Sequence, residues 1–371
     1  MERREFLRRV AALSGVVTTA GVTGFDLTNA LAATPVRDPS IVRSWGGLVV
    51  PETGAYWGAD DTTRGFTTAN NGIETQLGRR MGIRNRRYAW LKPCPGTAHV
   101  ADAALTNPKV VPMCSFTKDK RFPVKSASWP GGGDASTTSF GRGLDRIANG
   151  EFDAYWATTA RNLKALGTPV IFRLWMEMNG KHNPYSSMWQ GGVGVGEASF
   201  VAAWRRVHSV FAANGATLGA GGNCIFVFCA QRMSTSGSWK AYWPGDDVVD
   251  WSGLDLYRTT FLNGTRNPAG DMDTYDWAVA HGKPFIVCEA GFDQTKIVKT
   301  SEGSFDKDGS KTGHSLILDT RDKVKAHPQC VAYVHWNNVG PLTNDFVDTS
   351  ALSLTQYRTF ANDPYFGLTR T

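Results

Sequence analysis

Short apolar runs alternate with amphipathic stretches along most of the chain. The runs have the length of strands, and the stretches between them repeat apolar residues at helical spacing. The stretch 152–166 shows this spacing and stops at Gly167, and 200–211 does the same and stops at Gly215; glycine commonly follows a helix end. The predicted strands are Ala55–Trp57, Tyr88–Leu91, Val110–Phe116, Val170–Met176, Ile225–Cys229, Trp251–Leu256, Phe285–Glu289 and Val331–Trp336.

Strand–helix alternation repeated eight times is typical of a parallel sheet closed into a barrel. An open doubly wound sheet is the alternative, because it alternates in the same way. Residues 33–371 contain no Pro- or Ser-rich linker and no internal repeat. We therefore predict an α/β fold with a single (β/α)8 TIM barrel over 33–371 and extended loops at its C-terminal face. The glycine-rich segments 131–133 and 191–196 fit no dinucleotide or phosphate pattern and are expected in those loops.

The first 32 residues have the order of a signal peptide. Residues 3–7 match the twin-arginine export pattern, a modestly apolar stretch follows, and residues 30–32 offer a small-x-small cleavage site. An amphipathic N-terminal helix is the alternative. The apolar stretch is too short and too polar to span a bilayer, so we expect no transmembrane segment. Export by this route predicts an extracellular, periplasmic or envelope-associated protein.

The composition argues against several other functions. The formal charge is +7, but the excess is scattered, and no basic run is interleaved with aromatic residues. We therefore expect no nucleic-acid partner. The six cysteines form no Cys-x-x-Cys pair and no Cys/His spacing typical of zinc. Several lie inside apolar runs, which favours buried free thiols over disulfides.

No metal or organic cofactor is expected. The segment 305–311 resembles a calcium loop but lacks the remaining acidic ligands, which favours a solvated turn. No Gly-x-Ser-x-Gly elbow indicates Ser-His-Asp hydrolysis. The 13 tryptophans exceed what a core usually needs. We expect most to fill the core and some to line a cleft, where flat aromatic faces bind sugars.

Two glutamates end apolar strands, whereas the others lie in polar or helical surroundings. Glu177 ends the fourth predicted strand and Glu289 the seventh. Catalytic groups of barrels lie at the C-terminal ends of strands, and strands four and seven face each other across the mouth. Glycoside cleavage needs two such carboxylates, one as acid and one as nucleophile or base. The alternative is a structural ion pair, for which Arg173 is an available partner.

The segment 173–180, Arg-Leu-Trp-Met-Glu-Met-Asn-Gly, resembles the acid/base segment of glycoside hydrolase family 26, the β-mannanase family of the large barrel clan. That segment typically reads Arg-x-x-His-Glu-Met-Asn-Gly. The resemblance covers most of residues 150–340 in order and is specific from 170 to 291. Its other parts are the helix at 200–214, the approach to strand six at 242–257 and the nucleophile strand at 283–291.

The resemblance implies a role for each matching residue. Glu177 corresponds to the acid/base and Glu289 to the nucleophile. Tyr257 corresponds to a tyrosine that hydrogen-bonds the nucleophile, and Arg173 to an arginine that keeps it ionised. Trp189 corresponds to an aromatic residue of the substrate cleft.

Three further positions are expected to bind substrate. Asn179 belongs to the acid/base motif, and Trp336, at the end of strand eight, is a candidate floor for the central sugar or a core residue at the barrel rim. Met176 departs from the family, which has His there. A thioether cannot donate a hydrogen bond, so another group supplies the contact, the sugar differs, or activity is weak.

Other polar residues lie near these strand ends. Asp255 is a candidate third carboxylate of the site. His182, in the loop after Glu177, is a candidate substrate contact or a surface histidine, and His335 leaves the same two readings open.

The combined prediction is a secreted, retaining, endo-acting β-glycosidase that acts on a polysaccharide or oligosaccharide, and we expect a monomer. β-1,4-Mannan leads by resemblance, followed by mixed-linkage glucan, β-xylan or an envelope polysaccharide. A non-catalytic carbohydrate-binding barrel is the alternative from another class, and an envelope-anchored structural protein is a third.

Overall fold

The computed structural model describes the greater part of the chain after residue 35. The described residues are 36–67, 71–89, 91–117, 143–231, 238–257, 271–292, 298–300, 303–305, 313–339 and 344–370. The predicted signal peptide, the glycine-rich segment 131–133 and most of the calcium-like segment lie outside them. Among the described helices, none combines the length and the apolar character that a membrane crossing requires.

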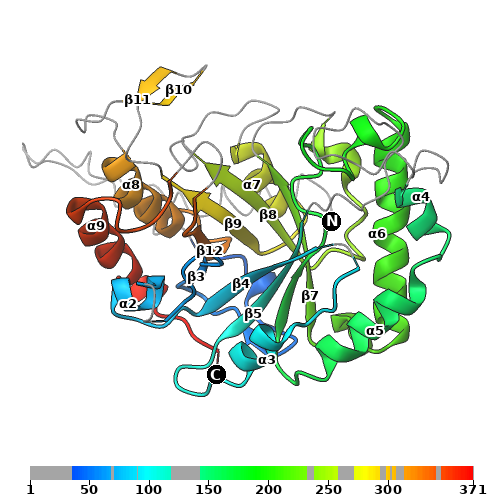
Figure 1. The fold of residues 1–371 in the computed structure, drawn as a ribbon, viewed down its shortest axis with the longest axis horizontal. Helices are drawn as coiled ribbons and strands as arrows, with labels where there is room; N and C mark the ends of the chain where they lie inside the picture. The colour runs from blue at the N-terminus through cyan, green and yellow to red at the C-terminus, as the bar shows by residue number, and fades with distance from the viewer. Residues whose placement is uncertain are drawn as a thin grey trace, which may run out of the picture. The chain divides into compact units, whose positions relative to one another are not determined.

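Eight parallel strands close into a barrel (Figure 1). Each strand pairs with the next one along the chain, and β12 closes the ring by pairing with both β3 and β9. This closure confirms the (β/α)8 barrel and excludes the open sheet. The strands are β3 (Tyr56–Asp60), β4 (Ile83–Tyr88), β5 (Val111–Phe116), β6 (Val170–Arg173), β7 (Cys224–Gln231), β8 (Trp251–Tyr257), β9 (Phe285–Gly291) and β12 (Cys330–Trp336).

Helices lie between the strands, and α5 and α6 pack against each other on one flank of the barrel (Figure 1). Both agree with the helical spacing in the sequence: Gly167 and Gly215, which follow them, have left-handed φ angles of 61° and 67°. The helices are α2 (Ile73–Leu77), α3 (Thr97–Ala103), α4 (Gly143–Ala148), α5 (Asp153–Lys164), α6 (Val195–Ala213), α7 (Asp271–Ala280), α8 (Gly313–Ala326) and α9 (Ala351–Ala361).

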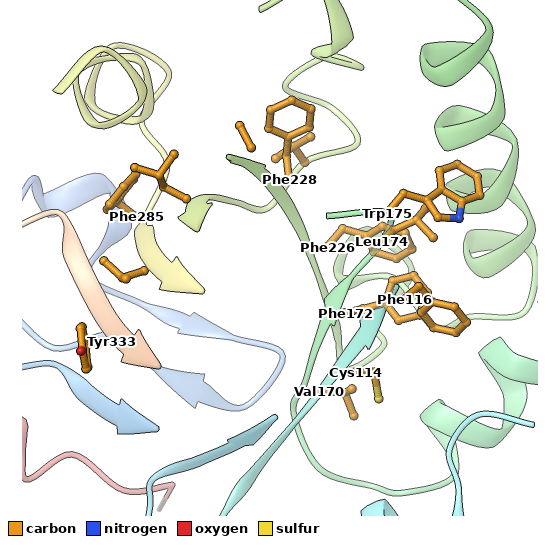
Figure 2. Close-up of a cluster of buried hydrophobic side chains, with 14 of the residues drawn as sticks. Cys114, Phe116, Val170, Phe172, Leu174, Trp175, Phe226, Phe228, Phe285 and Tyr333 are labelled. Atoms are coloured by element: carbon orange, nitrogen blue, oxygen red, sulfur yellow. The ribbon is translucent and has the colours of Figure 1, made fainter. Parts of the chain in front are cut away.

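Alternation along the strands separates two cores. Outward-facing residues pack against the helices, and Figure 2 shows Phe116, Phe172 and Phe226 of neighbouring strands in this outer cluster. The ring centroid of Phe172 lies 5.3 Å from that of Phe116 and 5.0 Å from that of Phe226. Ile171, one residue earlier, belongs to the inner cluster. The same alternation therefore turns Arg173 into the barrel.

A short hairpin contributes to the inner cluster. Strands β1 (Ser44–Trp45) and β2 (Leu48–Val49) pair antiparallel, and Trp45 packs edge-on against Trp251, the first residue of β8, at 6.4 Å between ring centroids. Since Trp251 begins its strand, the hairpin covers the N-terminal end of the barrel, opposite the strand ends that carry the two glutamates. A second hairpin joins β10 (Val298–Thr300) and β11 (Gly303–Phe305).

The second strand differs from the prediction. The sequence indicated Tyr88–Leu91, whereas β4 runs from Ile83 to Tyr88. β4 is not an apolar run, because several of its side chains are polar or charged. The charged side chains form ion pairs within the protein. Arg84, for example, pairs with Glu74 at 2.6 Å and with Asp102 at 2.7 Å, all three being buried. The fourth strand also ends earlier than expected, at Arg173 rather than Met176.

Candidate active site

Glu289 reaches the barrel interior through a β-bulge. In the pairing with β8, Leu254 opposes Val287 but Asp255 opposes Glu289, so Cys288 is an extra residue in β9. The pairing with β12 shows the same shift. Strict alternation from Ile286 and Cys288, which belong to the inner cluster, would turn Glu289 outward. The bulge re-aims its side chain toward the interior.

Two hydrogen-bond donors and a second guanidinium group surround the Glu289 carboxylate. Arg173 donates to Oε1, the Tyr257 hydroxyl donates to Oε2 at 2.6 Å, and Nη2 of Arg87 lies 2.9 Å from Oε2. Burial alone would raise the pKa of Glu289, but the two guanidinium groups and the hydroxyl outweigh it and lower that pKa to about 2. Glu289 is therefore ionised at neutral pH, as a carboxylate nucleophile must be.

Each arginine is held by a second carboxylate. Nη1 of Arg173 donates to Oδ1 of Asp255 at 2.7 Å, and Nε of Arg87 donates to Oδ2 of Asp60 at 2.8 Å. Asp255 and Asp60 are buried. Burial raises the pKa of Asp255 well above its usual range, although Arg173 lies beside it. Carboxylates and guanidinium groups thus alternate from β3 through Glu289 to β8, which fixes both arginines against Glu289.

Glu177 lies four residues beyond the end of β6, in strained backbone. Its φ angle is 57° and that of Trp175 is 48°, a left-handed region that costs a non-glycine residue roughly 1–2 kcal/mol. Its N–H donates to the Cys229 carbonyl of β7 at 2.8 Å, which holds this turn in place. Strain of this kind persists where the surroundings impose it and often marks a functional site. The Glu177 side chain is 18% exposed, and its Oε2 lies 2.9 Å from Nε2 of His182.

The structure brings Arg173, Tyr257 and Glu289 together, as the sequence predicted. Trp336 stands beside them, edge-on to Tyr257 at 5.7 Å between ring centroids, with the Arg87 guanidinium over its ring at 5.6 Å. Trp336 is partly exposed, which suits a sugar platform better than a core residue.

Two expected substrate contacts instead support the backbone. Asn179 is fully buried, and its side-chain amide exchanges two hydrogen bonds of 2.9 Å with the main chain of Gln231. Met176 is 4% exposed and packs in the inner core. We therefore reassign both to the positioning of Glu177. Trp189 remains half-buried, and its indole donates to the Lys181 carbonyl at 2.7 Å.

Other candidates lie apart from the carboxylate pair. His335 is buried, donates from Nε2 to the Asp345 carbonyl at 2.9 Å and packs against Trp57 and Tyr357, which makes it a core residue. Burial lowers its pKa to about 4.

All six cysteines are free and buried, in agreement with the sequence.

One group of metal-ligand type occurs among the described residues. Ligand atoms of Cys229, Asp255 and Cys288 lie within 4.8 Å of one another. The Asp255 oxygen in this group already accepts from Arg173 and from the Cys229 thiol, at 2.7 and 3.2 Å. We therefore assign the group to the surroundings of Arg173 and Glu289.

Sequence reasoning missed Arg87 and Asp60. Asp60 ends β3, which runs three residues beyond the predicted end at Trp57. Arg87 lies in β4, a strand that the apolar pattern did not indicate because it is rich in arginine. The available signal was the three arginines within residues 84–87, since charges in a barrel strand are costly unless they are paired.

Part of the chain is similar to known glycoside hydrolases. Residues 138–302 match the model of glycosyl hydrolase family 26. Endoglucanase H of Acetivibrio thermocellus is 31% identical over 150 residues, which cover 38% of this chain and 16% of that protein. The β-1,3-xylanase TXYA of a Vibrio species is 29% identical over 153 residues, covering 40% and 28%. The aligned segments thus span less than a third of either relative.

Solved structures share the fold. A family 26 β-mannanase from Bacteroides ovatus superimposes with a TM-score of 0.56 over 84% of this chain and 90% of that chain, at 14% identity. The segment that matches the family model includes Arg173, Glu177, Tyr257 and Glu289.

Proposed function

We propose that this chain, which belongs to glycosyl hydrolase family 26, hydrolyses β-glycosidic bonds of a polysaccharide with retention of anomeric configuration. The observation that carries the proposal is the unequal setting of the two strand-end glutamates. Glu289 is held ionised by two guanidinium groups and a tyrosine hydroxyl, whereas Glu177 stands outside that cluster and reaches solvent. Two carboxylates in such different environments suit the two roles of a retaining glycosidase.

The chemistry proceeds in two steps. Glu289 attacks the anomeric carbon while Glu177 gives its proton to the departing oxygen, which leaves a covalent glycosyl-enzyme. Glu177 then takes a proton from water as the water attacks the same carbon, and Glu289 leaves. Tyr257 and the two arginines stabilise Glu289 as a leaving carboxylate in this second step.

Glu289→Gln and Glu177→Gln separate the two roles. We expect the Glu289 variant to lose at least about a thousandfold in kcat, because the nucleophile is gone. The Glu177 variant should keep more activity on aryl glycosides with a good leaving group, which need no acid, and added azide should restore turnover by replacing water in the second step. Proton NMR of the first product should show the β-anomer; an α-anomer would contradict retention.

We propose a β-linked plant or envelope polysaccharide as substrate, with β-1,4-mannan first. The relatives are named as an endoglucanase and a β-1,3-xylanase and the structural neighbours as mannanases, so glucan and xylan belong in the same test. Reducing ends released from mannan, mixed-linkage glucan, β-1,3- and β-1,4-xylan and bacterial envelope polysaccharides identify the sugar. Binding to a polymer without release would instead favour a carbohydrate-binding barrel.

We also propose that residues 1–32 export the folded protein by the twin-arginine route. Replacing Arg3 and Arg4 with Lys should leave the protein inside the cell, and the mature form outside should begin near residue 33 by mass spectrometry. We further propose that the mature chain is a monomer, which size-exclusion chromatography with light scattering tests.

A further inference from the structure

His182 contacts the acid/base candidate directly. Its Nε2 lies 2.9 Å from Oε2 of Glu177, while the His182 side chain is 46% exposed. The other carboxylate oxygen, Oε1, makes no hydrogen bond to the described part of the chain. One oxygen of Glu177 is thus occupied by an imidazole and the other is left for a substrate.

The loop that carries His182 is tied to the backbone of Glu177. Nδ2 of Asn183 donates to the Glu177 carbonyl at 2.8 Å, and the Gly180 N–H donates to the same carbonyl at 2.9 Å. Tyr185 donates to the Met176 carbonyl at 2.6 Å. These bonds make the loop a closed turn around residues 176–185. The imidazole is therefore placed by the same turn that places the carboxyl group.

Charge and chemistry determine the direction of this hydrogen bond. An ionised carboxylate can only accept, so the imidazole donates from Nε2 whenever Glu177 is ionised. Met176, directly before Glu177, cannot donate a hydrogen bond and is buried. Tyr185 and Asp255 also interact electrostatically with Glu177, but both are buried and are tied to other groups. His182 is the donor that this structure places on the acid/base carboxyl.

We propose that His182 donates its Nε2–H to Oε2 of Glu177 throughout the reaction and so keeps the transferable proton on Oε1, toward the glycosidic oxygen. This inference rests on the proposed function. In the first step the Oε1–H bond breaks as the leaving oxygen gains the proton, and the Glu289–carbon bond forms as the glycosidic bond breaks. Negative charge then develops on Glu177, and the hydrogen bond from His182 strengthens as it becomes charge-assisted. In the second step Oε1 takes the proton of the attacking water, and His182 is unchanged.

The test compares leaving groups. Phenyl glycosides need their oxygen protonated, whereas 2,4-dinitrophenyl glycosides do not. With β-mannobiosides, β-cellobiosides and β-xylobiosides of both kinds, we expect His182→Ala to lower kcat/KM at least about tenfold on the phenyl substrate, as lost acid catalysis does. On the dinitrophenyl substrate the change should be less than about twofold. His182→Gln, which keeps an N–H donor, should recover much of the loss. The control is His281→Ala, which removes a histidine that pairs with Asp246 instead of Glu177 and should match the wild type.

Equal losses on both substrates, or a rise in KM alone, would overturn the proposal, because they indicate a structural loop residue or a sugar contact. A wild-type protein that cleaves no dinitrophenyl glycoside would instead overturn the proposed function.

The hydrogen bond between His182 and Glu177 is also tested without turnover. In ¹⁵N-histidine NMR near pH 7.5, the exposed His182 should show a slowly exchanging Nε2–H signal that is lost in Glu177→Ala. Absence of this signal in the wild type would also contradict the proposal.

Discussion

At the scale of single residues, the environment of one carboxylate decides the chemistry. Glu289 is buried, yet two guanidinium groups and a hydroxyl stabilise its charged form more strongly than burial opposes it. Arg87 is the contributor that lies farthest in sequence from the family motif, and it also faces Trp336. Its removal therefore alters the surroundings of Glu289 without touching the segment 138–302 that matches the family model.

We predict that Arg87→Gln moves the acidic limb of the kcat/KM profile upward. The pKa of Glu289 lies below its ordinary value of 4.5, at about 2, because of positive neighbours, so removing one of them raises it. The limb marks the pH at which Glu289 becomes protonated and inactive, and it should rise by about one unit or more. Arg86→Gln is the matched control, since Arg86 lies on the same strand but pairs with Asp102. An unchanged limb in Arg87→Gln would show that Arg87 does not tune the nucleophile.

Much of the site could be predicted from the sequence, but not all of it. Glu177 and Glu289 stood out because a carboxylate at the end of an apolar run is costly without a use, and Arg173 and Tyr257 followed from the motif around them. Arg87 and Asp60 could not be found in this way, since only closure of the barrel through β12 brings these residues of the first two strands near Glu289. The local pattern also could not show that Asn179 turns toward β7 instead of the cleft.

At the scale of elements, the conformation of β9, the strand that bears Glu289, depends on its neighbour β8. The bulge at Cys288 needs space on β8, and Gly253 provides it. A Cβ on Gly253 would lie 2.6 Å from Sγ of Cys288 and 3.0 Å from the Ile286 carbonyl oxygen. β8 therefore needs a residue without a Cβ at the position that faces the bulge of β9. The sequence predicted both strands from their apolar character, but a bulge leaves no signature in such a run.

Gly253→Ala should therefore destabilise the protein by about 1–3 kcal/mol, the usual cost of overpacking a core. Urea unfolding of the mature protein measures the difference. Gly219→Ala is the control, because a Cβ there meets nothing within 4 Å. Adding Cys288→Ala should recover part of the loss by removing the sulfur. Equal stability of Gly253→Ala and Gly219→Ala would mean that the bulge has more room than the structure indicates.

At the scale of the whole molecule, stability and chemistry belong to opposite ends of the barrel. The N-terminal hairpin packs Trp45 against Trp251 at one end, and the carboxylates lie at the other. The eightfold alternation in the sequence was sufficient to predict this architecture. The hairpin was not predicted, because its strands are two residues long and their apolar residues show neither helical nor strand periodicity.

Trp45→Ala should lower the free energy of unfolding by about 3–5 kcal/mol, as the loss of a buried Trp usually does, because it opens a cavity under the barrel. The kcat of the remaining folded protein should be unchanged within about twofold, since stability and catalysis occupy opposite faces of such barrels. Thermal unfolding and active-site titration, run side by side with the exposed-residue control Leu352→Ala, separate the two effects. A fall in kcat without a fall in stability would contradict this division.

The most direct test of a Glu289 nucleophile is to trap the covalent intermediate. A 2-deoxy-2-fluoro glycosyl fluoride of the sugar that the protein accepts should form a stable adduct, because fluorine slows both steps and the good leaving group favours the first. Intact mass should increase by one sugar, and peptide sequencing should place the adduct on Glu289 within the segment 285–291. Tyr257→Phe should still form it, more slowly. An adduct on Glu177, or turnover with no adduct and an inverted product, would contradict the assignment of Glu289 as nucleophile.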